Sequence, residues 1–428
     1  MSESEFHLFA TRRFAPLFVV QFLGALNDNL FKNAVLILIV YRLAGGGGFS
    51  SGTMVNIAAG LFIAPFFLFS ASAGQLADKL EKARLIRLIK LGEIVIMALA
   101  AWGLITGWAS FLLVVLFLMG AQSAFFGPLK YSILPEHLRK DELIAGNGLI
   151  EAGTFLAILA GTLIGGLLIL SAGGVYKVSA LVLAVAVAGW LASRAIPRAG
   201  PCAPGLRINP DFLGETRAML RFARVDREIF HAILGISWFW LLGSVVLAQF
   251  PGFVKSVLGA NEQVVTLFLA LFSIGVGLGS LACNTLLAGR VSARYAPVCL
   301  LGLAGFMIDL FFASPGAPPA AGELIGAAVF LSGLANGRIM LDLTAIALCG
   351  GLFIVPLYAL LQSRARPAHR ARVIAANNIM NALFMVIGAA FAAGVRGAGL
   401  SIPALFLVLA LASLGVAAFL QTRGSDDG

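Results

Sequence analysis

Long apolar stretches alternate with short polar and basic segments along the whole chain. Most stretches run for about 20 residues, the length that an α-helix needs to cross a hydrocarbon core of about 30 Å. A transmembrane β-barrel would instead show alternating segments of about ten residues, and the sequence lacks this pattern. A further apolar segment at 323–334 is too short to span, and we predict that it lies along the outer side of the membrane or re-enters it. The pattern predicts twelve spanning helices, at residues 14–43, 53–76, 85–106, 109–129, 144–170, 175–196, 228–250, 263–288, 296–313, 341–362, 373–395 and 402–421.

The composition agrees with this pattern. Hydrophobic residues make up 60% of the chain and charged residues only 12%, with a mean hydropathy of +0.97. A soluble domain carries about 25% charged residues. The first apolar run is longer than a signal peptide and lacks an A-x-A cleavage site, so we interpret it as a retained helix. The four cysteines form no CxxC or Cys/His cluster, so no metal, disulfide or cofactor is expected.

The formal net charge of +10 is unevenly distributed. If both termini are cytoplasmic, the inside loops hold 24 of the 30 Lys and Arg residues and the outside loops hold five. The remaining basic residue, Lys32, lies within the first span. An excess of positive charge on the cytoplasmic side is the rule for multi-pass membrane proteins. This topology explains the charge without a nucleic-acid partner, and the basic loops are expected to face anionic lipid head groups.

The longest inside loop separates six spans from six. It begins with a Pro/Gly-rich piece and continues into an Arg-rich amphipathic stretch. We therefore predict one bundle over residues 1–196, a basic linker over 197–227 and a second bundle over 228–428. Residues 145–152 and 375–382 share the pattern A-x-N-x-[LI]-[IM]-[EN]-A, which indicates an internal repeat. The predicted fold is an all-α polytopic membrane protein with two pseudo-symmetric six-helix bundles, the architecture of the major facilitator fold, whose substrate site lies between the halves.

The first span carries polar residues near its middle. An ionised side chain at the centre of a bilayer costs at least about 2.5–3.5 kcal/mol. On a helix, Gln21, Asp28 and Lys32 fall on one face, and the last two are four residues apart and able to pair. We interpret this face as turned toward protein or a water-filled cavity. A functional site is favoured, with a structural ion pair as the alternative.

The loop after the second span, residues 74–84, reads G-Q-L-A-D-K-L-E-K-A-R. It resembles the major facilitator signature G-x-L-a-D-[RK]-x-G-[RK]-x-[RK] between the second and third helices. In that family the acid and the bases hold the cytoplasmic faces of the helices together in the outward-open state. The resemblance implies such a cytoplasmic latch at Gly74, Asp78, Lys82 and Arg84. Glu81 stands where the second glycine is usual, which puts the tight turn there in doubt.

Three segments narrow the resemblance: residues 21–29, G-P-L-K-Y-S-I-L-P at 127–135 and A-G-N-G-L-I-E-A at 145–152. Together they resemble the bacterial lysophospholipid transporters, a branch of the major facilitators. This resemblance implies a transporter, not an enzyme, of the bacterial inner (cytoplasmic) membrane. It would flip lysophosphatidylethanolamine and related lysolipids from the outer to the inner leaflet by alternating access. It also implies a partner, an acyl-carrier-protein-dependent acyltransferase that restores the second acyl chain.

A zwitterionic head group needs an anion for its ammonium and a cation for its phosphate. Asp28 and Glu151 are candidates for the ammonium, and Lys32 and Lys130 for the phosphate. The predicted substrate-binding residues are Gln21, Asp28, Asn29, Lys32, Lys130, Tyr131, Asn147, Glu151, Tyr358, Asn377 and Asn381. The acyl chain needs no polar site, and its predicted contacts are Phe31, Trp238 and Trp240.

The sequence is also compatible with two other functions. A proton-coupled drug or solute antiporter of the same fold would use Asp28 or Glu151 as its proton carrier. A membrane scaffold or receptor would keep the fold without transport. Structural roles also remain open: Lys130 and Tyr131 suit the membrane interface, and Asn147 and Asn381 suit hydrogen bonds between helices. Trp238 and Trp240 are alternatively packing residues.

Overall fold

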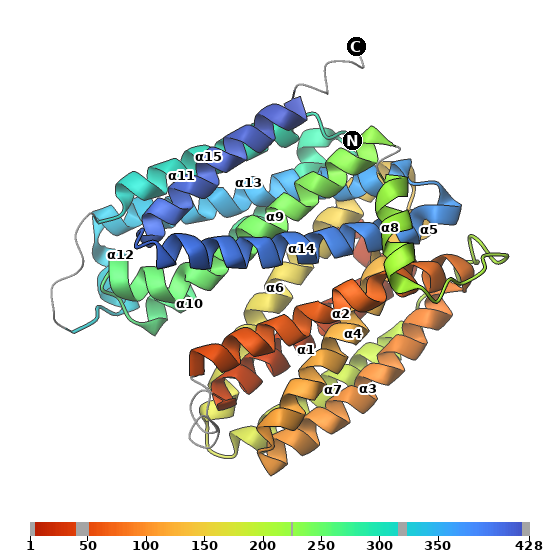
Figure 1. Ribbon diagram of the computed structural model, residues 1–428, viewed down its shortest axis with the longest axis horizontal. Coiled ribbons are helices and arrows are strands. Elements are labelled where there is room, and N and C mark those ends of the chain that lie inside the picture. Colours follow the sequence, from red (N-terminus) through yellow and green to blue (C-terminus); the bar gives the residue numbers. More distant parts are fainter. Residues whose placement is uncertain (1–4, 40–50, 224–225, 316–322, 422–428) are drawn as a thin grey trace.

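The computed structural model describes residues 5–39, 51–223, 226–315 and 323–421, and this part of the chain is almost entirely helical (Figure 1). Eleven of its helices are long and apolar enough to cross a membrane. The twelfth, α1, has 24 residues and is about 36 Å long, but its polar residues lower its hydropathy. The long helices are α1 Ala15–Leu38, α2 Ser51–Lys79, α3 Lys82–Thr106, α4 Ala109–Ser132, α6 Leu143–Leu170, α7 Gly174–Ser193, α9 Arg227–Gly252, α10 Glu262–Leu287, α11 Ala296–Ala313, α13 Leu334–Arg364, α14 Arg370–Gly397 and α15 Ile402–Gln421. The predicted all-α polytopic fold is confirmed.

Two helix boundaries differ from the sequence prediction in an informative way. The predicted tenth span starts at residue 341, whereas α13 begins at Leu334. The extra turns contain Arg338, whose charge made the segment resemble a loop, but Arg338 pairs with Asp309 of the neighbouring α11. At the other boundary, α1 ends at Leu38, and residues 40–43 of the predicted first span lie outside the described residues.

Short elements join the long helices. At the loops lie η1 Glu5–Ala10, α5 Leu134–His137, η3 Lys140–Glu142, α8 Phe212–Ala223, η4 Phe253–Val257, α12 Ala327–Ser332 and η5 Pro367–His369. The amphipathic stretch predicted before the seventh span is helix α8, which packs against α2 and α14. The short helix predicted within 323–334 is the six-residue α12. A parallel bridge between Ala260 and Ile325 precedes it.

The long helices pack as two groups (Figure 1). In the first half, α1 packs on α6 and α7, α2 on α4, and α3 on α7 and α4. In the second half, α10 and α11 pack on α13, α11 on α15, and α14 on α9. The halves meet where α6 packs on α10 and α13, and where α14 packs on α2 and α4. These four contacts form the interface between the halves, where the major facilitator fold has its substrate site.

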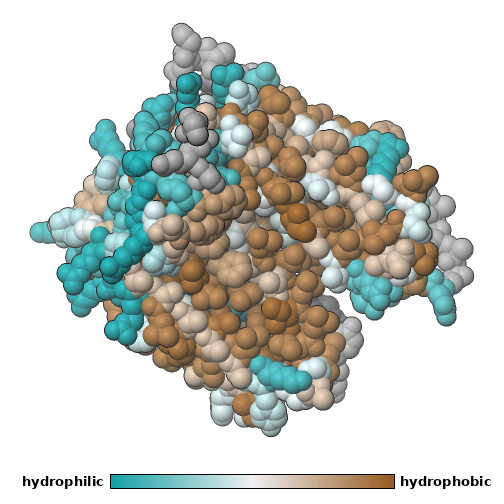
Figure 2. All heavy atoms as spheres, turned by 180° about the vertical axis from the view of Figure 1, so that it is seen from behind, coloured by the Kyte–Doolittle hydropathy of each residue, from teal (hydrophilic) through white to brown (hydrophobic). Residues whose placement is uncertain are grey.

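The two ends of the molecule differ. The loops that join α2 to α3, α4 to α6 and α13 to α14 lie together with α8, and we call this the basic end (Figure 1). Here the halves approach closely: a Cβ on Gly148 would lie 2.6 Å from the Ser280 carbonyl oxygen, and one on Gly74 would lie 2.7 Å from the Ala375 Cβ. Figure 2 shows a hydrophilic cap over the basic end and a notch between the halves away from that cap. The halves are therefore closed at the basic end and parted at the opposite end.

Candidate functional site

The polar face of α1 turns toward α4. The Ser123 hydroxyl donates to the Asp28 carboxylate at 2.6 Å. The Lys32 ammonium donates to Asn29 Oδ1 at 3.0 Å and lies 5.3 Å from the centre of the Phe62 ring. Among the described residues, no ion pair joins Asp28 to Lys32, so the predicted direct pair is wrong. The physical reason is that α4 and α1 itself offer each group a closer hydrogen-bond partner.

A buried polar network lies behind this face, and the sequence did not reveal it. The Lys90 ammonium lies 2.6 Å from a Glu93 carboxylate oxygen, and both side chains are almost fully buried. Asn27 and Gln122 donate to the two oxygens of Glu93 at 3.0 and 3.1 Å. The Ser123 hydroxyl, which bonds Asp28, also lies 3.3 Å from Gln122 Oε1. The face of α1 is thus connected to a charged pair in the interior of the first half.

The sequence carries only one local signal for this buried network. Lys90 lies near the basic inside end of the predicted third span, and Glu93 is the one acid among the apolar residues of that span. The signal that could have found the pair is their spacing of three residues on one helix, which brings side chains together on a helix surface. The Asn27 and Gln122 partners come from other helices and carry no such local signal.

At the interface of the halves, two tyrosines stack. The Tyr131 ring of α4 lies 4.3 Å from the Tyr358 ring of α13, with an angle of 9° between the planes. The Tyr131 hydroxyl donates to Glu151 of α6, and the Trp240 indole donates to the Tyr358 hydroxyl at 3.1 Å. The Lys130 ammonium lies 4.6 Å from the centre of the Tyr131 ring. Four predicted substrate-binding residues and Trp240, a predicted acyl-chain contact, therefore meet where the halves touch.

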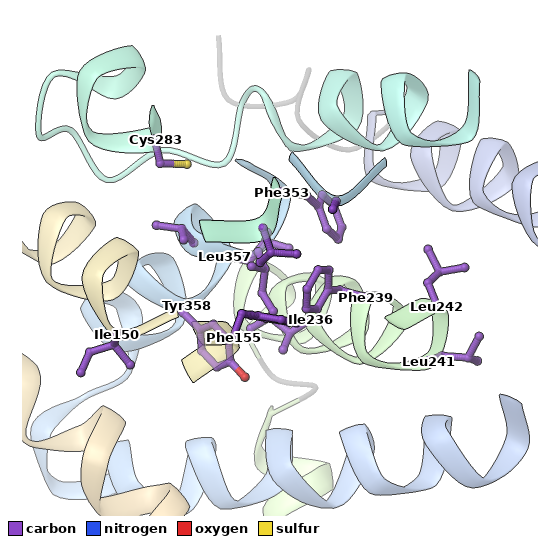
Figure 3. Packing of buried hydrophobic residues seen from close by; sticks show 14 of the residues in the cluster. Ile150, Phe155, Ile236, Phe239, Leu241, Leu242, Cys283, Phe353, Leu357 and Tyr358 are labelled. Atoms are coloured by element: carbon purple, nitrogen blue, oxygen red, sulfur yellow. The ribbon is translucent and has the colours of Figure 1, made fainter. Parts of the chain in front are cut away.

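Glu151 is fully buried at this point. Its second carboxylate oxygen has no hydrogen-bond partner within the described part of the chain. Asn377 of α14 is also fully buried, next to Tyr358. Figure 3 shows the apolar surroundings, with Ile150 and Phe155 of α6 close to Tyr358 and to residues of α9. A buried carboxyl group with a free oxygen, placed where the two halves meet, suits proton or cation chemistry.

The predicted asparagine and glutamine residues serve two kinds of contact. Asn147 and Gln362 donate to one another reciprocally at 2.8 Å, which joins the two halves. Gln21 instead bonds the Ile150 carbonyl within the first half, and Asn381 accepts from a serine of α9 within the second. Asn29 also donates to the carbonyl of Ala25, one turn earlier on α1. Of these residues, only Asn147 and its unpredicted partner Gln362 form a contact between halves.

The predicted acyl-chain contacts do not lie together. Phe31 is fully buried in the apolar core of the first half, so it is closed to a substrate in this conformation. Trp238 donates to Ser413 of α15 at 3.1 Å, which places it within the second half. Trp240 lies at the interface, where its ring stacks on Phe155 with centroids 6.3 Å apart. In this conformation, Phe31 and Trp238 lie inside separate halves, and Trp240 lies where the halves meet.

Asp78 joins the halves at the basic end. Its fully buried carboxylate accepts from the backbone amides of Ala371 and Arg372 at 3.0 and 3.3 Å, and from Arg372 Nε at 3.1 Å. Those amides belong to the first turn of α14, whose own N-cap residue, His369, makes no side-chain cap. Orphan amides and the helix dipole both favour a negative charge at this position. Asp78 therefore caps a helix of the other half.

The other predicted latch residues differ from Asp78. Gly74 lets α2 approach α14, as its short Cβ distances show. The buried Lys82 ammonium pairs with Glu136 at 2.5 Å and also bonds Cys202 at 3.2 Å. Burial and the nearby Glu136 carboxylate raise the pKa of the Cys202 thiol, so it stays protonated and donates to that carboxylate.

Arg84 is exposed, and its backbone amide donates to Glu81. Glu81 is the extended N-cap residue of α3, and this explains how the turn forms without a glycine. The contacts recorded for Lys82 and Arg84 in the described chain lie within the first half and the linker. Lys82 therefore joins the start of α3 to α5 within the first half, and of the predicted latch charges Asp78 is the one seen to bond the other half among the described residues.

Comparisons with known proteins agree with this architecture. Residues 17–389 match the family model of the Major Facilitator Superfamily. A protein of Yersinia pestis named "Lysophospholipid transporter LplT" is 29% identical over 366 residues, which cover 83% of this chain and 80% of that protein.

Solved structures share the fold. The Escherichia coli fucose:proton symporter FucP superposes with a TM-score of 0.70 at 16% identity, covering 98% of this chain and 99% of that chain. The human organic anion transporter MFSD10 gives 0.71 at 15% identity, covering 94% and 99%. The match to the family model spans most of the described helices. The chain belongs to the Major Facilitator Superfamily of transporters.

Proposed function

We propose that this transporter flips lysophospholipids, lysophosphatidylethanolamine and its relatives, from the outer to the inner leaflet of a bacterial inner membrane. The observation that carries the proposal is the 29% identity, over 83% of the chain, to a protein named lysophospholipid transporter. The flipped lysolipid would be a substrate for re-acylation, so an acyl-carrier-protein-dependent acyltransferase is the proposed partner.

The accessible charges of the first half support a zwitterionic substrate. Asp28, Lys32 and Lys130 keep partly exposed side chains, whereas Lys90, Glu93 and Glu151 are buried. An ammonium group would pair with the Asp28 carboxylate, and a phosphate would pair with the two lysines. The buried Lys90–Glu93 pair would hold the α1 face in position through Gln122 and Ser123 rather than bind the lipid.

The conformation supports alternating access. Basic residues of multi-pass proteins gather on the cytoplasmic side, so we assign the basic end and both termini to the cytoplasm. The halves are closed there by Asp78, by the Asn147–Gln362 pair and by the stacked Tyr131 and Tyr358. The notch at the opposite end then faces the outer leaflet (Figure 2). A lysolipid would enter from that side, and the closed contacts would have to part for its release.

A proton-coupled antiporter of the same fold is the second candidate. The observation that favours it is the buried Glu151 carboxyl group, whose free oxygen lies between the halves. Liposomes that contain the protein distinguish the two functions. If labelled lysolipid stays in its leaflet while a proton gradient drives uptake of an organic cation, the antiporter is correct. A scaffold would show neither activity.

Replacing Asp28 by asparagine is expected to slow lysophosphatidylethanolamine flipping at least about tenfold, because a charge-assisted hydrogen bond to the ammonium is worth about 1.5–3 kcal/mol. Lys32→Ala is expected to act similarly on the phosphate. Flipping is measured in proteoliposomes by the accessibility of labelled lysolipid to an external quencher.

The matched controls remove the same charges at exposed positions. Asp141→Asn lies at the basic end, where its side chain is 68% exposed, and Lys177→Ala lies on an exposed loop-side turn of α7. Both controls should flip at the wild-type rate. Normal flipping by Asp28→Asn and Lys32→Ala together would overturn the assignment of the head-group site.

A further inference from the structure

A second group of intramembrane charges lies in the other half, away from the proposed substrate site. Arg338 of α13 donates to both carboxylate oxygens of Asp309 on α11, with its Nε at 2.9 Å. Asp342 follows Arg338 by one helical turn, so its carboxyl group lies on the same face of α13 as the guanidinium that holds Asp309. Two carboxyl groups and one guanidinium therefore form a single cluster between neighbouring helices.

The members of this cluster differ in exposure. The Arg338 and Asp309 side chains are 53% and 40% exposed. Asp342 is only 1% exposed, and its Oδ2 has no hydrogen-bond partner within the described residues. Asp309 lies four residues before the end of α11 and Arg338 four residues after the start of α13, about 6 Å along each helix. The cluster is thus reachable from the end opposite the basic end, with one buried carboxyl group behind it.

The charges of this cluster do not balance. In the first half, each buried or intramembrane acid has its own cation: Glu93 has Lys90, Glu151 has Lys130, and Asp28 has Lys32 nearby. In the second half, one guanidinium serves both Asp309 and Asp342. A buried carboxylate without a full counter-charge is costly in a membrane. Two neighbouring carboxyl groups resolve such an imbalance when they share one proton, because like charges in contact cannot both ionise readily.

Among the described residues, the surroundings of Asp342 add no further charge. One turn further along α13, a cavity between α9, α10, α11 and α13 is lined by apolar residues such as Phe239, Met307 and Ile346. On α10, the acidic residue Glu262 lies at the start of the helix. The charged groups that act on the Asp342 carboxyl group are Asp309 and Arg338. On α6, Glu151 faces Tyr358, which lies 16 residues and about 24 Å further along α13. The nearest charges are therefore those of the cluster itself.

We propose that Asp309 and Asp342 form a proton-binding site that holds one proton between the two carboxyl groups, beside Arg338. Proton binding converts a cluster of net charge −1 into a neutral one, and the proton bridges two oxygens that would otherwise repel each other. A metal cation fits less well, because the guanidinium already occupies both oxygens of Asp309. The site is independent of the proposed lysolipid substrate and of the α1 face.

The test is a comparison of wild type with Asp342→Asn, which keeps the side-chain shape but does not titrate. In infrared difference spectra between about pH 6 and about pH 9, wild type should lose the C=O band of one protonated carboxyl group. Asp342→Asn should lack this band, while the exposed control Asp141→Asn should retain it. Wild type should also unfold at a lower temperature at the higher pH, because deprotonation restores the repulsion, and the variant should not.

Asp309→Asn provides a second variant at a partly exposed position, in case Asp342→Asn does not fold. It should also remove the band, because Arg338 is then free to neutralise Asp342 alone. The proposal is overturned if the same band persists in both variants, or if wild type shows no titrating carboxyl group in this range. Because neither readout involves lipid transport, a failure here is distinct from a failure of the flippase proposal.

Discussion

Replacing Asp78 by alanine is expected to open the basic end and to reduce transport at least about tenfold. The Asp78 carboxylate is fully buried and accepts three hydrogen bonds from the first turn of α14. Truncating one partner of a buried, hydrogen-bonded charge pair costs about 2–5 kcal/mol. Here that cost falls on one conformation only, the one in which the halves are closed at the basic end. Each 1.4 kcal/mol changes an equilibrium constant tenfold, so the population of the state that is open at the basic end should increase strongly.

The opening is measured as a distance between spin labels attached at Leu80 and Arg366, which are both exposed at the basic end on opposite halves. The distance distribution should shift to longer values in Asp78→Ala, while Asp78→Asn should shift it less because an amide oxygen still accepts. Arg84→Ala is the matched control, since Arg84 is exposed and its recorded contact is a backbone one within the first half. Unchanged distances in Asp78→Ala would show that this contact does not hold the halves together.

Removing the Lys90 side chain is expected to cause the largest loss of stability. Lys90→Ala leaves the buried Glu93 carboxyl group without its counter-charge, and breaking a buried pair in this way costs about 3–5 kcal/mol. Thermal unfolding of the purified protein in detergent should show a clear decrease in the midpoint temperature. The yield of monodisperse protein should decrease with it.

The double variant Lys90→Met with Glu93→Gln separates charge from packing. It removes both charges at similar volume, which is often neutral or stabilising for a buried pair. The glutamine also keeps an oxygen that can accept from Asn27 or Gln122. The double variant should therefore recover most of the lost stability. If it is as unstable as Lys90→Ala, the pair is not the source of the effect.

Hydropathy and loop charge were sufficient to predict the helical membrane fold, because each spanning helix must be apolar over its own length. Because hydropathy is averaged along each segment, it does not reveal charged or polar side chains whose partners lie on other helices. The charge of Arg338 is typical of a loop, yet Arg338 lies within α13, where Asp309 of α11 accepts from it. Glu93 follows its counter-charge Lys90 by three residues on α3, but its other two partners, Asn27 and Gln122, come from α1 and α4. Partners distant in sequence leave no local pattern.

In the candidate site, too, the sequence identifies individual residues but not their partners from distant parts of the chain. The motif between α2 and α3 identified Asp78 as important, but its partner is the start of α14, almost 300 residues away, rather than Lys82 or Arg84 of the same loop. The sequence repeat directed attention to Asn147 and Asn377, but their roles differ. Asn147 pairs with Gln362 across the halves, whereas Asn377 lies buried next to Tyr358. A repeat fixes equivalent positions on helices, and the pseudo-symmetric partners need not make equivalent contacts.

The cap that Asp78 provides has a consequence for the chemistry of the α14 backbone. The amides of Ala371 and Arg372 are shielded by a carboxylate that belongs to the other half, since His369 does not cap its own helix. Whenever the basic end parts, these two amides lose their acceptor and meet water. The hydrogen–deuterium exchange rate of these two amides is therefore expected to increase with the frequency at which the halves separate at the basic end. It can be measured in unlabelled protein and in any lipid.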